Sequence, residues 1–184
     1  MTYRKLFAAM ADQISDEQIL EVANILLERS RADGFIYVIG NGGSASTASH
    51  FCVDLGVGSC RRGINLRAIC LTDNSGAITA SGNDSSFENI YSFQLEHLAT
   101  SKDILVILSA SGNSPNLLSA TQKAIDLGMW TVSITGFDGG ELKKLAKVNL
   151  HLESAKGEYG VVEDLHLSIC HRITEAIRFI GTNR

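Results

Sequence analysis

The chain has 184 residues, of which 45% are hydrophobic and 20% charged, as in an ordinary globular protein with one core. Its net charge of −4, without any basic block, argues against a nucleic-acid-binding surface. We expect no signal peptide and no membrane span, because no apolar segment has the needed length. None of the four cysteines forms a CxxC pair, so we expect free thiols in a single cytoplasmic domain over residues 1–184.

Apolar runs recur along the sequence in an order that predicts an α/β fold. Residues 2–31 have a helical period, and Asp16 could cap a second segment, which would break the helix near Ser15. Strands are predicted at 35–39, 66–72, 104–109, 130–135 and 148–152. Helices are predicted at 44–57, 75–98, 115–128, 139–146 and 159–180. Alternating strands and helices indicate a mostly parallel, doubly wound sheet with helices on both faces.

A glycine-rich loop follows the first predicted strand and leads directly into a helix. Its residues Asn41, Gly42, Gly43 and Ser44 would bring the backbone close to a ligand, and the helix start offers N–H groups to an anion. The alternative is a tight turn between strand and helix that binds nothing. The loop is neither a Walker motif nor GxGxxG, so neither ATP nor NAD is indicated.

A serine-rich loop follows the third predicted strand. Ser109, Ser111 and Ser114 precede Pro115, which suits the first position of a helix. The alternative is a loop whose serines only cap that helix. In a parallel sheet, however, loops at the carboxyl ends of the strands bind ligands, so two such loops together predict a phosphate monoester site. Neither loop has a Walker lysine, which suggests that the phosphate is held and not transferred.

These loops carry a resemblance to a known family. The segments 40–44, 82–84 and 109–114 resemble those of the sugar isomerase (SIS) domain, and nearly the whole chain is similar to the phosphoheptose isomerases, which act on sedoheptulose 7-phosphate. The resemblance implies a flavodoxin-like sheet of five parallel strands with long first and last helices. It also implies a homotetramer with active sites at subunit interfaces. The residues it implies in substrate binding are Asn41, Gly42, Gly43, Ser44, Asp73, Ser109, Ala110, Ser111 and Ser114.

The resemblance further implies a zinc site, which could hold another divalent metal instead. By position, its ligands are His50, Asp54, Glu163 and His171. Two of them differ from the family pattern, since aspartate stands for glutamate at 54 and glutamate for glutamine at 163. The family also has two arginines, and this chain has glycine and valine at those positions, 58 and 161.

Helical spacing gives independent support to part of this set. His50 and Asp54 lie on one face at i, i+4, where they could chelate zinc or form a surface ion pair. Glu163 and His171 are eight residues apart, about 12 Å along a helix. Two ligands so far apart do not easily reach one ion, so we expect a neighbouring subunit to supply one of them if both serve one site. His97, His151 and His166 are expected to be structural or exposed.

The predicted activity is the isomerisation of a phosphorylated sugar between aldose and ketose forms, through an enediol. The resemblance implies sedoheptulose 7-phosphate as substrate and a role in lipopolysaccharide or capsule precursor synthesis. It assigns Asp54 as the base and His171 as the acid, with Glu163 as an alternative base that the sequence does not separate from Asp54. A non-catalytic phosphosugar sensor or scaffold, or an isomerase of another phosphosugar, remain the alternatives.

Overall fold

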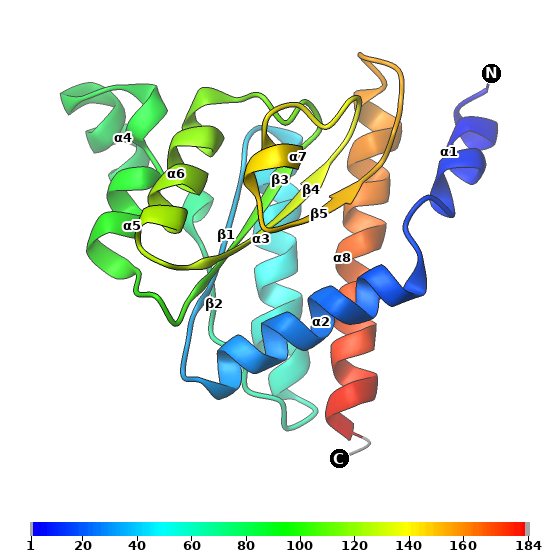
Figure 1. The fold of residues 1–184 in the computed structure, drawn as a ribbon, viewed down its shortest axis with the longest axis horizontal. Helices are drawn as coiled ribbons and strands as arrows, with labels where there is room; N and C mark the ends of the chain where they lie inside the picture. Colours follow the sequence, from blue (N-terminus) through cyan, green and yellow to red (C-terminus); the bar gives the residue numbers. More distant parts are fainter. Residues whose placement is uncertain (1, 183–184) are drawn as a thin grey trace.

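The computed structural model describes residues 2–182, which form a five-stranded parallel sheet covered by helices (Figure 1). The strands are β1 (Ile36–Gly40), β2 (Ala68–Cys70), β3 (Ile104–Ser109), β4 (Trp130–Thr135) and β5 (Val148–His151). They lie in the order β2-β1-β3-β4-β5, and every pair is parallel. This is the flavodoxin-like order, so the predicted fold class is confirmed. The order in which successive strands are added to the sheet reverses between β1 and β3, and ligands of such sheets bind beyond the carboxyl ends of the strands at that point.

The central strands are buried on both faces, which explains why they are continuous apolar runs. Their side chains alternate between two cores, because successive residues of a strand point to opposite sides. Ile36 and Val38 of β1 belong to one core, and Tyr37 and Ile39 belong to the other.

Four helices cover the first core and the rest cover the second (Figure 1). The first group is α1 (Tyr3–Ala11), α2 (Asp16–Arg31), α3 (Gly43–Val53) and α8 (Tyr159–Thr182). The second group is α5 (Ser92–Leu98), α6 (Pro115–Asp126) and the short α7 (Leu142–Leu145), with α4 (Ser75–Asp84) beyond them. Within the described residues, no helix is long and apolar enough to cross a membrane.

Several predicted boundaries need correction. The break in the first helix is confirmed, but the capping residue is Ser15, which forms a capping box with Gln18. The single helix predicted at 75–98 is wrong, because α4 and α5 are separated by a 3-10 turn at Phe87–Asn89. The helix predicted at 139–146 shrinks to α7, since Gly139 and Gly140 have positive φ angles of 87° and 54°.

The second strand and the helix after the first loop also differ from the prediction. The strand predicted at 66–72 is only β2, because residues Leu71–Asp73 turn into a 3-10 helix. The helix predicted at 44–57 is α3 followed by a π-helical turn over Asp54–Gly58. All four cysteines are free thiols, as expected.

Candidate active site

The glycine loop joins β1 to α3 through a tight turn. Gly42 precedes the helix with a φ of +54°, which favours glycine. A Cβ on Gly40 would lie 2.7 Å from the carbonyl carbon of Ser44, so this glycine is needed for the close packing of the turn. The geometry of the turn thus explains Gly40 and Gly42 without any ligand, which agrees in part with the alternative of a tight turn that binds nothing.

The serine loop bends back on itself before α6. Gly112 N–H donates to Ser109 Oγ at 3.0 Å, and Asn113 N–H donates to Ser111 Oγ at 3.3 Å. Ser114 is the N-cap residue of α6, yet its side chain makes no capping hydrogen bond. The alternative that these serines only cap the helix therefore does not hold for Ser114, whose hydroxyl lies at the N-terminus of α6.

Hydrogen bonds hold the two loops against each other. The side-chain amides of Asn41 and Asn116 exchange two hydrogen bonds of 2.9 Å each. Tyr91 O–H donates to the Gly40 carbonyl at 2.7 Å, and burial raises the pKa of this phenol to about 12. Sequence reasoning did not assign Asn116 or Tyr91. Asn116 stood in a recognised loop, but Tyr91 lay inside a segment predicted as continuous helix, so nothing marked it.

A cavity of about 150 Å³, here called the loop cavity, lies between the glycine loop, the serine loop and the start of α8. It brings together most of the residues predicted to bind substrate. Its polar and small lining residues are Asn41, Ser44, Ser109, Ala110, Ser111 and Ser114, joined by Leu108, Leu117, Tyr159 and Glu163. Backbone N–H groups at the starts of α3 and α6 border this space, so it suits an anion of phosphate size.

Glu163 reaches this cavity from the first turns of α8. Its carboxylate lies directly over Gly43, where an added Cβ would come within 2.6 Å of Glu163 Cδ. Gly43 therefore makes room for the carboxylate at the N-terminus of α3, a position that the helix dipole favours for a negative charge.

The other three predicted metal ligands come together elsewhere. His50 Nε2 lies 3.0 Å from His171 Nε2 and 3.3 Å from Asp54 Oδ2, and His171 Nε2 lies 3.6 Å from the same oxygen. The side chains of His50 and His171 are half exposed, at 49% and 50%. Both histidines belong to one chain, although α3 and α8 are far apart in the sequence.

The spacing of these atoms fits a metal ion. Zinc ligands at about 2.0–2.2 Å in tetrahedral geometry stand about 3.3–3.6 Å from one another. The three distances of 3.0, 3.3 and 3.6 Å scatter around that range. Two imidazoles and one carboxylate would leave a fourth position for water or substrate, which is the pattern of catalytic zinc sites. Glu163 lies outside this group of three.

The positions of the two missing arginines have different environments. A Cβ on Gly58 would lie 2.8 Å from Nη2 of Arg178 and 3.9 Å from Oδ1 of Asp54. The guanidinium of Arg178, on α8, thus occupies the space next to Asp54 that a side chain at position 58 would enter. Val161 is 1% exposed in the core, where its apolar side chain is well accommodated.

The geometry of α3 and α8 relates the cavity to the histidine cluster. The helices pack together and both begin at the same edge of the sheet (Figure 1). His50 follows Gly43 by seven residues and His171 follows Glu163 by eight, so the cluster lies about 10–12 Å further along the two helices. Asp73 accepts a hydrogen bond of 3.0 Å from Ser49 on α3, at the level of the cluster.

The remaining three histidines lie outside the loop cavity and the histidine cluster, and they range from fully buried to exposed. His166 is fully buried on α8, and burial lowers its pKa to about 4. His151 is half-buried at the end of β5 and contacts Thr135 Oγ1 at 3.1 Å, and burial lowers its pKa as well. His97 is exposed near the end of α5.

Comparison with known proteins places these features in a class. The model of the SIS domain family matches residues 2–136, which include the glycine loop, the serine loop and the strands β1 to β4. Because the match spans well over half of the chain, the class of protein is that of the SIS domains.

More similar relatives narrow the class. Phosphoheptose isomerase 1 of Campylobacter jejuni is 36% identical over 167 residues, covering 91% of this chain and 89% of the relative. The phosphoheptose isomerase of Helicobacter pylori is 36% identical over 161 residues, covering 88% and 83%. The phosphoheptose isomerase structures from Neisseria gonorrhoeae and Francisella tularensis each superpose with a TM-score of 0.84, at 32% and 30% identity, covering 93% and 92% of this chain and 90% and 89% of theirs. The chain belongs to the SIS domain family and, within it, to the phosphoheptose isomerases.

Proposed function

We propose that this protein isomerises a seven-carbon sugar phosphate, converting sedoheptulose 7-phosphate into an aldoheptose 7-phosphate. The relatives named phosphoheptose isomerase support the reaction class. The observation that carries the proposal is the separation of about 10–12 Å between the loop cavity and the histidine cluster along α3 and α8.

We propose that the substrate is anchored by its phosphate group, which binds in the loop cavity. The hydroxyls of Ser109, Ser111 and Ser114 line this space, and the start of α6 adds N–H groups. Hydrogen bonds from such donors to a charged phosphate are stronger than those between neutral groups. With the phosphate held there, the length of the sugar chain decides which carbon reaches the cluster.

That length favours a seven-carbon substrate. Extended chains advance about 1.2 Å per bond, so the carbonyl end of a heptose 7-phosphate lies about 8–10 Å from its phosphorus. A triose phosphate would span only about 5 Å on the same basis and would leave its carbonyl short of the cluster. The separation therefore matches the substrate that the relatives' names indicate.

The same argument favours Asp54 over Glu163 as the base. Glu163 lines the loop cavity, whereas Asp54 contacts both histidines of the cluster. We propose that the Asp54 carboxylate removes the proton from C1 of the ketose while the C2 carbonyl oxygen, beside His171, takes up a proton from water, which gives the enediol. Return of a proton to C2 and loss of the O1 proton complete the aldose. Glu163 would bind hydroxyls near the phosphate end.

The donor set of His50, Asp54 and His171 fits a zinc ion or another divalent metal. When bound, such an ion would polarise the carbonyl and enediol oxygens as a Lewis acid. The imidazoles must be neutral to serve as ligands, so metal binding should weaken as the pH is lowered.

We also infer a homotetramer with active sites at subunit interfaces, in the cytoplasm, supplying precursors of lipopolysaccharide or capsule. What supports the interface is the surface around the cluster. Val53 and Val57 are 57% and 55% exposed on either side of Asp54, and a second copy of the chain would cover them. Light scattering of the purified protein tests the tetramer.

The decisive experiment follows product by NMR with sedoheptulose 7-phosphate, fructose 6-phosphate, ribulose 5-phosphate and dihydroxyacetone phosphate. We expect turnover of the heptose and little of the shorter sugars. Chelation, or Asp54→Asn, should abolish turnover while phosphosugar binding persists in calorimetry. Comparable turnover of the triose would refute the length argument. Binding without turnover of any sugar, in protein loaded with zinc, would instead identify a phosphosugar sensor.

A further inference from the structure

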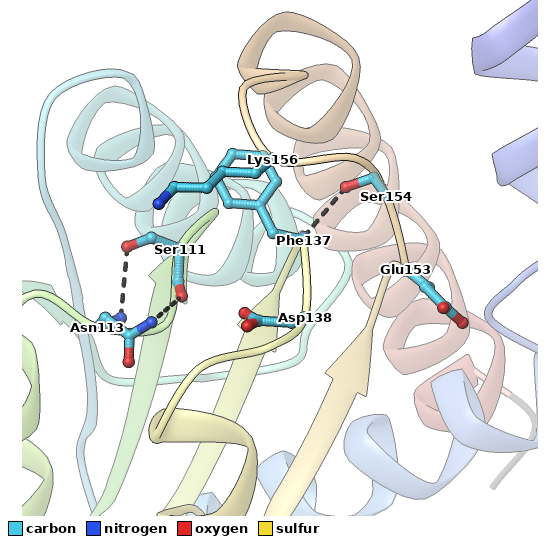
Figure 2. A pocket seen from close by; sticks show the side chains of 7 residues that line it. All are labelled: Ser111, Asn113, Phe137, Asp138, Glu153, Ser154 and Lys156. Atoms are coloured by element: carbon cyan, nitrogen blue, oxygen red, sulfur yellow. Dashed lines mark hydrogen bonds between the residues drawn. The ribbon is translucent and has the colours of Figure 1, made fainter.

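A second cavity opens on the other side of the serine loop. It has a volume of about 260 Å³ and is lined by Ser111, Asn113, Phe137, Asp138, Glu153, Ser154 and Lys156 (Figure 2). Ser111 lines this cavity and the loop cavity alike. A phosphate held by Ser111 would therefore border both spaces.

The charges around that phosphate are mostly of the wrong sign. Asp138 and Glu153 line the second cavity, and Glu163 lines the first. Among the described residues that line either space, Lys156 is the one lysine or arginine. Figure 2 shows the Glu153 side chain pointing away from Ser111, which leaves Asp138 and Glu163 as the carboxylates that share these spaces with the serine loop. A phosphate dianion there needs a compensating charge beyond the N–H groups of α6.

The loop that carries Lys156 is attached to Phe137 at both of its ends. Phe137 N–H donates to Ser154 Oγ at 3.0 Å, and Ser154 N–H donates to the Phe137 carbonyl at 3.2 Å. At the other end, the Tyr159 ring packs edge-on against the Phe137 ring, with centroids 4.9 Å apart. Residues 155–158 consequently form a short arch whose two feet are fixed.

The arch itself has a defined turn. Glu158 N–H donates to the Ala155 carbonyl at 3.2 Å, and Gly157 has a φ of +101° that favours glycine. Phe137, which holds both feet, also has a positive φ of 50°, an uncommon conformation for a non-glycine residue. In Figure 2 the ammonium group of Lys156 points toward the side of the cavity where Ser111 lies. The backbone thus directs this lysine over the serine loop.

We propose that Lys156 binds the substrate phosphate from the side of the second cavity, opposite Glu163. This inference rests on the proposed function, because it assumes that the serine loop holds the phosphate. Lys156 then supplies the positive charge that the serines lack and offsets the repulsion from the surrounding carboxylates.

The position of Lys156 determines which kinetic constant it affects. The phosphate is remote from the reacting carbons, so its contacts are the same in the ground state and the transition state. Loss of the lysine should raise KM and leave kcat nearly unchanged. Since Lys156 is exposed, added salt should screen the effect.

The test compares Lys156→Gln with Lys156→Arg and a matched control, Lys144→Gln. Lys144 is an exposed lysine of α7 that pairs with Glu141 and lines neither cavity. We expect Lys156→Gln to raise KM for sedoheptulose 7-phosphate about five- to tenfold at low salt, with a smaller rise at high salt. Lys156→Arg should retain most of the affinity, and the control should behave like the wild type.

Calorimetry with inorganic phosphate separates this proposal from the proposed function. Lys156→Gln should bind inorganic phosphate about five- to tenfold more weakly than the wild type, whether or not any sugar is turned over. Equal phosphate affinity in the two proteins, or an equal loss in Lys144→Gln, would overturn the role of Lys156. Absence of turnover by wild-type protein, with the phosphate difference intact, would overturn only the isomerase activity.

Discussion

Gly43→Ala is a small change that should separate stability from activity. The added Cβ would lie 2.6 Å from Cδ of Glu163, whereas ordinary contacts begin at 3.4 Å, so the carboxylate must retreat by about 1 Å. Because the obstructing atoms are at the end of a flexible side chain, the backbone of α3 need not move.

The effect of this change on folding should be small. Gly43 is the first residue of α3, so an alanine there gains at most the roughly 0.5–1 kcal/mol by which alanine is favoured over glycine inside a helix. Moving a carboxylate away from a helix N-terminus costs about 0.3–1 kcal/mol. These terms oppose each other, so the free energy of unfolding should change by less than about 1 kcal/mol and Tm by no more than about 4 °C.

The effect on catalysis should be large. A displacement of about 1 Å in a group that positions substrate can cost up to about a hundredfold, so we expect kcat/KM to fall about ten- to hundredfold. Gly76→Ala provides the control, since its Cβ would meet its nearest neighbour, Asn74 Oδ1, at an ordinary 3.6 Å.

A double-mutant cycle identifies Glu163 as the cause. If Gly43→Ala acts by displacing the Glu163 side chain, it should have little further effect in a Glu163→Ala background, where that side chain is absent: the added loss of transition-state stabilisation, calculated from kcat/KM, should be less than about 0.5 kcal/mol. A full additional loss in that background would show that the methyl group obstructs substrate directly. Wild-type kinetics in Gly43→Ala alone would refute the importance of the Glu163 position.

Three further predictions follow from the site and the core. Ser111→Ala should weaken phosphosugar binding by about 1–3 kcal/mol in calorimetry without unfolding the protein, because it removes a hydrogen bond to a charged acceptor; unchanged affinity would contradict the phosphate assignment. Mixed oligomers of His50→Ala and His171→Ala subunits should not recover activity, since one chain supplies both histidines to the cluster; recovery would contradict this geometry. His166 has a pKa lowered to about 4 by burial, so the unfolded chain takes up a proton between about pH 6.5 and 4 that the folded one does not. Stability should fall by about 3 kcal/mol as the pH drops through that window, and urea unfolding of His166→Gln should lack this part of the slope; an unchanged slope would contradict it.

Much of the fold is readable from local patterns. The strands at 104–109 and 130–135 have the predicted bounds, because buried parallel strands are continuous apolar runs that end in polar loops. The prediction of one helix at 75–98 was wrong because the apolar pattern is informative only where side chains are buried. α4 buries no side chain, so its apolar residues gave no reliable account of where the helix ends.

The sequence by itself determined the order of strands and helices, the two loops and the i, i+4 pair of His50 and Asp54, since each depends on residues close together in the chain. Only the tertiary structure decided that His171 completes this pair while Glu163 lines the cavity between the glycine and serine loops. The physical reason is that α3 and α8 start at the same edge of the sheet and pack together. Residues at equal depth on these two helices become neighbours, although more than a hundred positions separate them in the sequence.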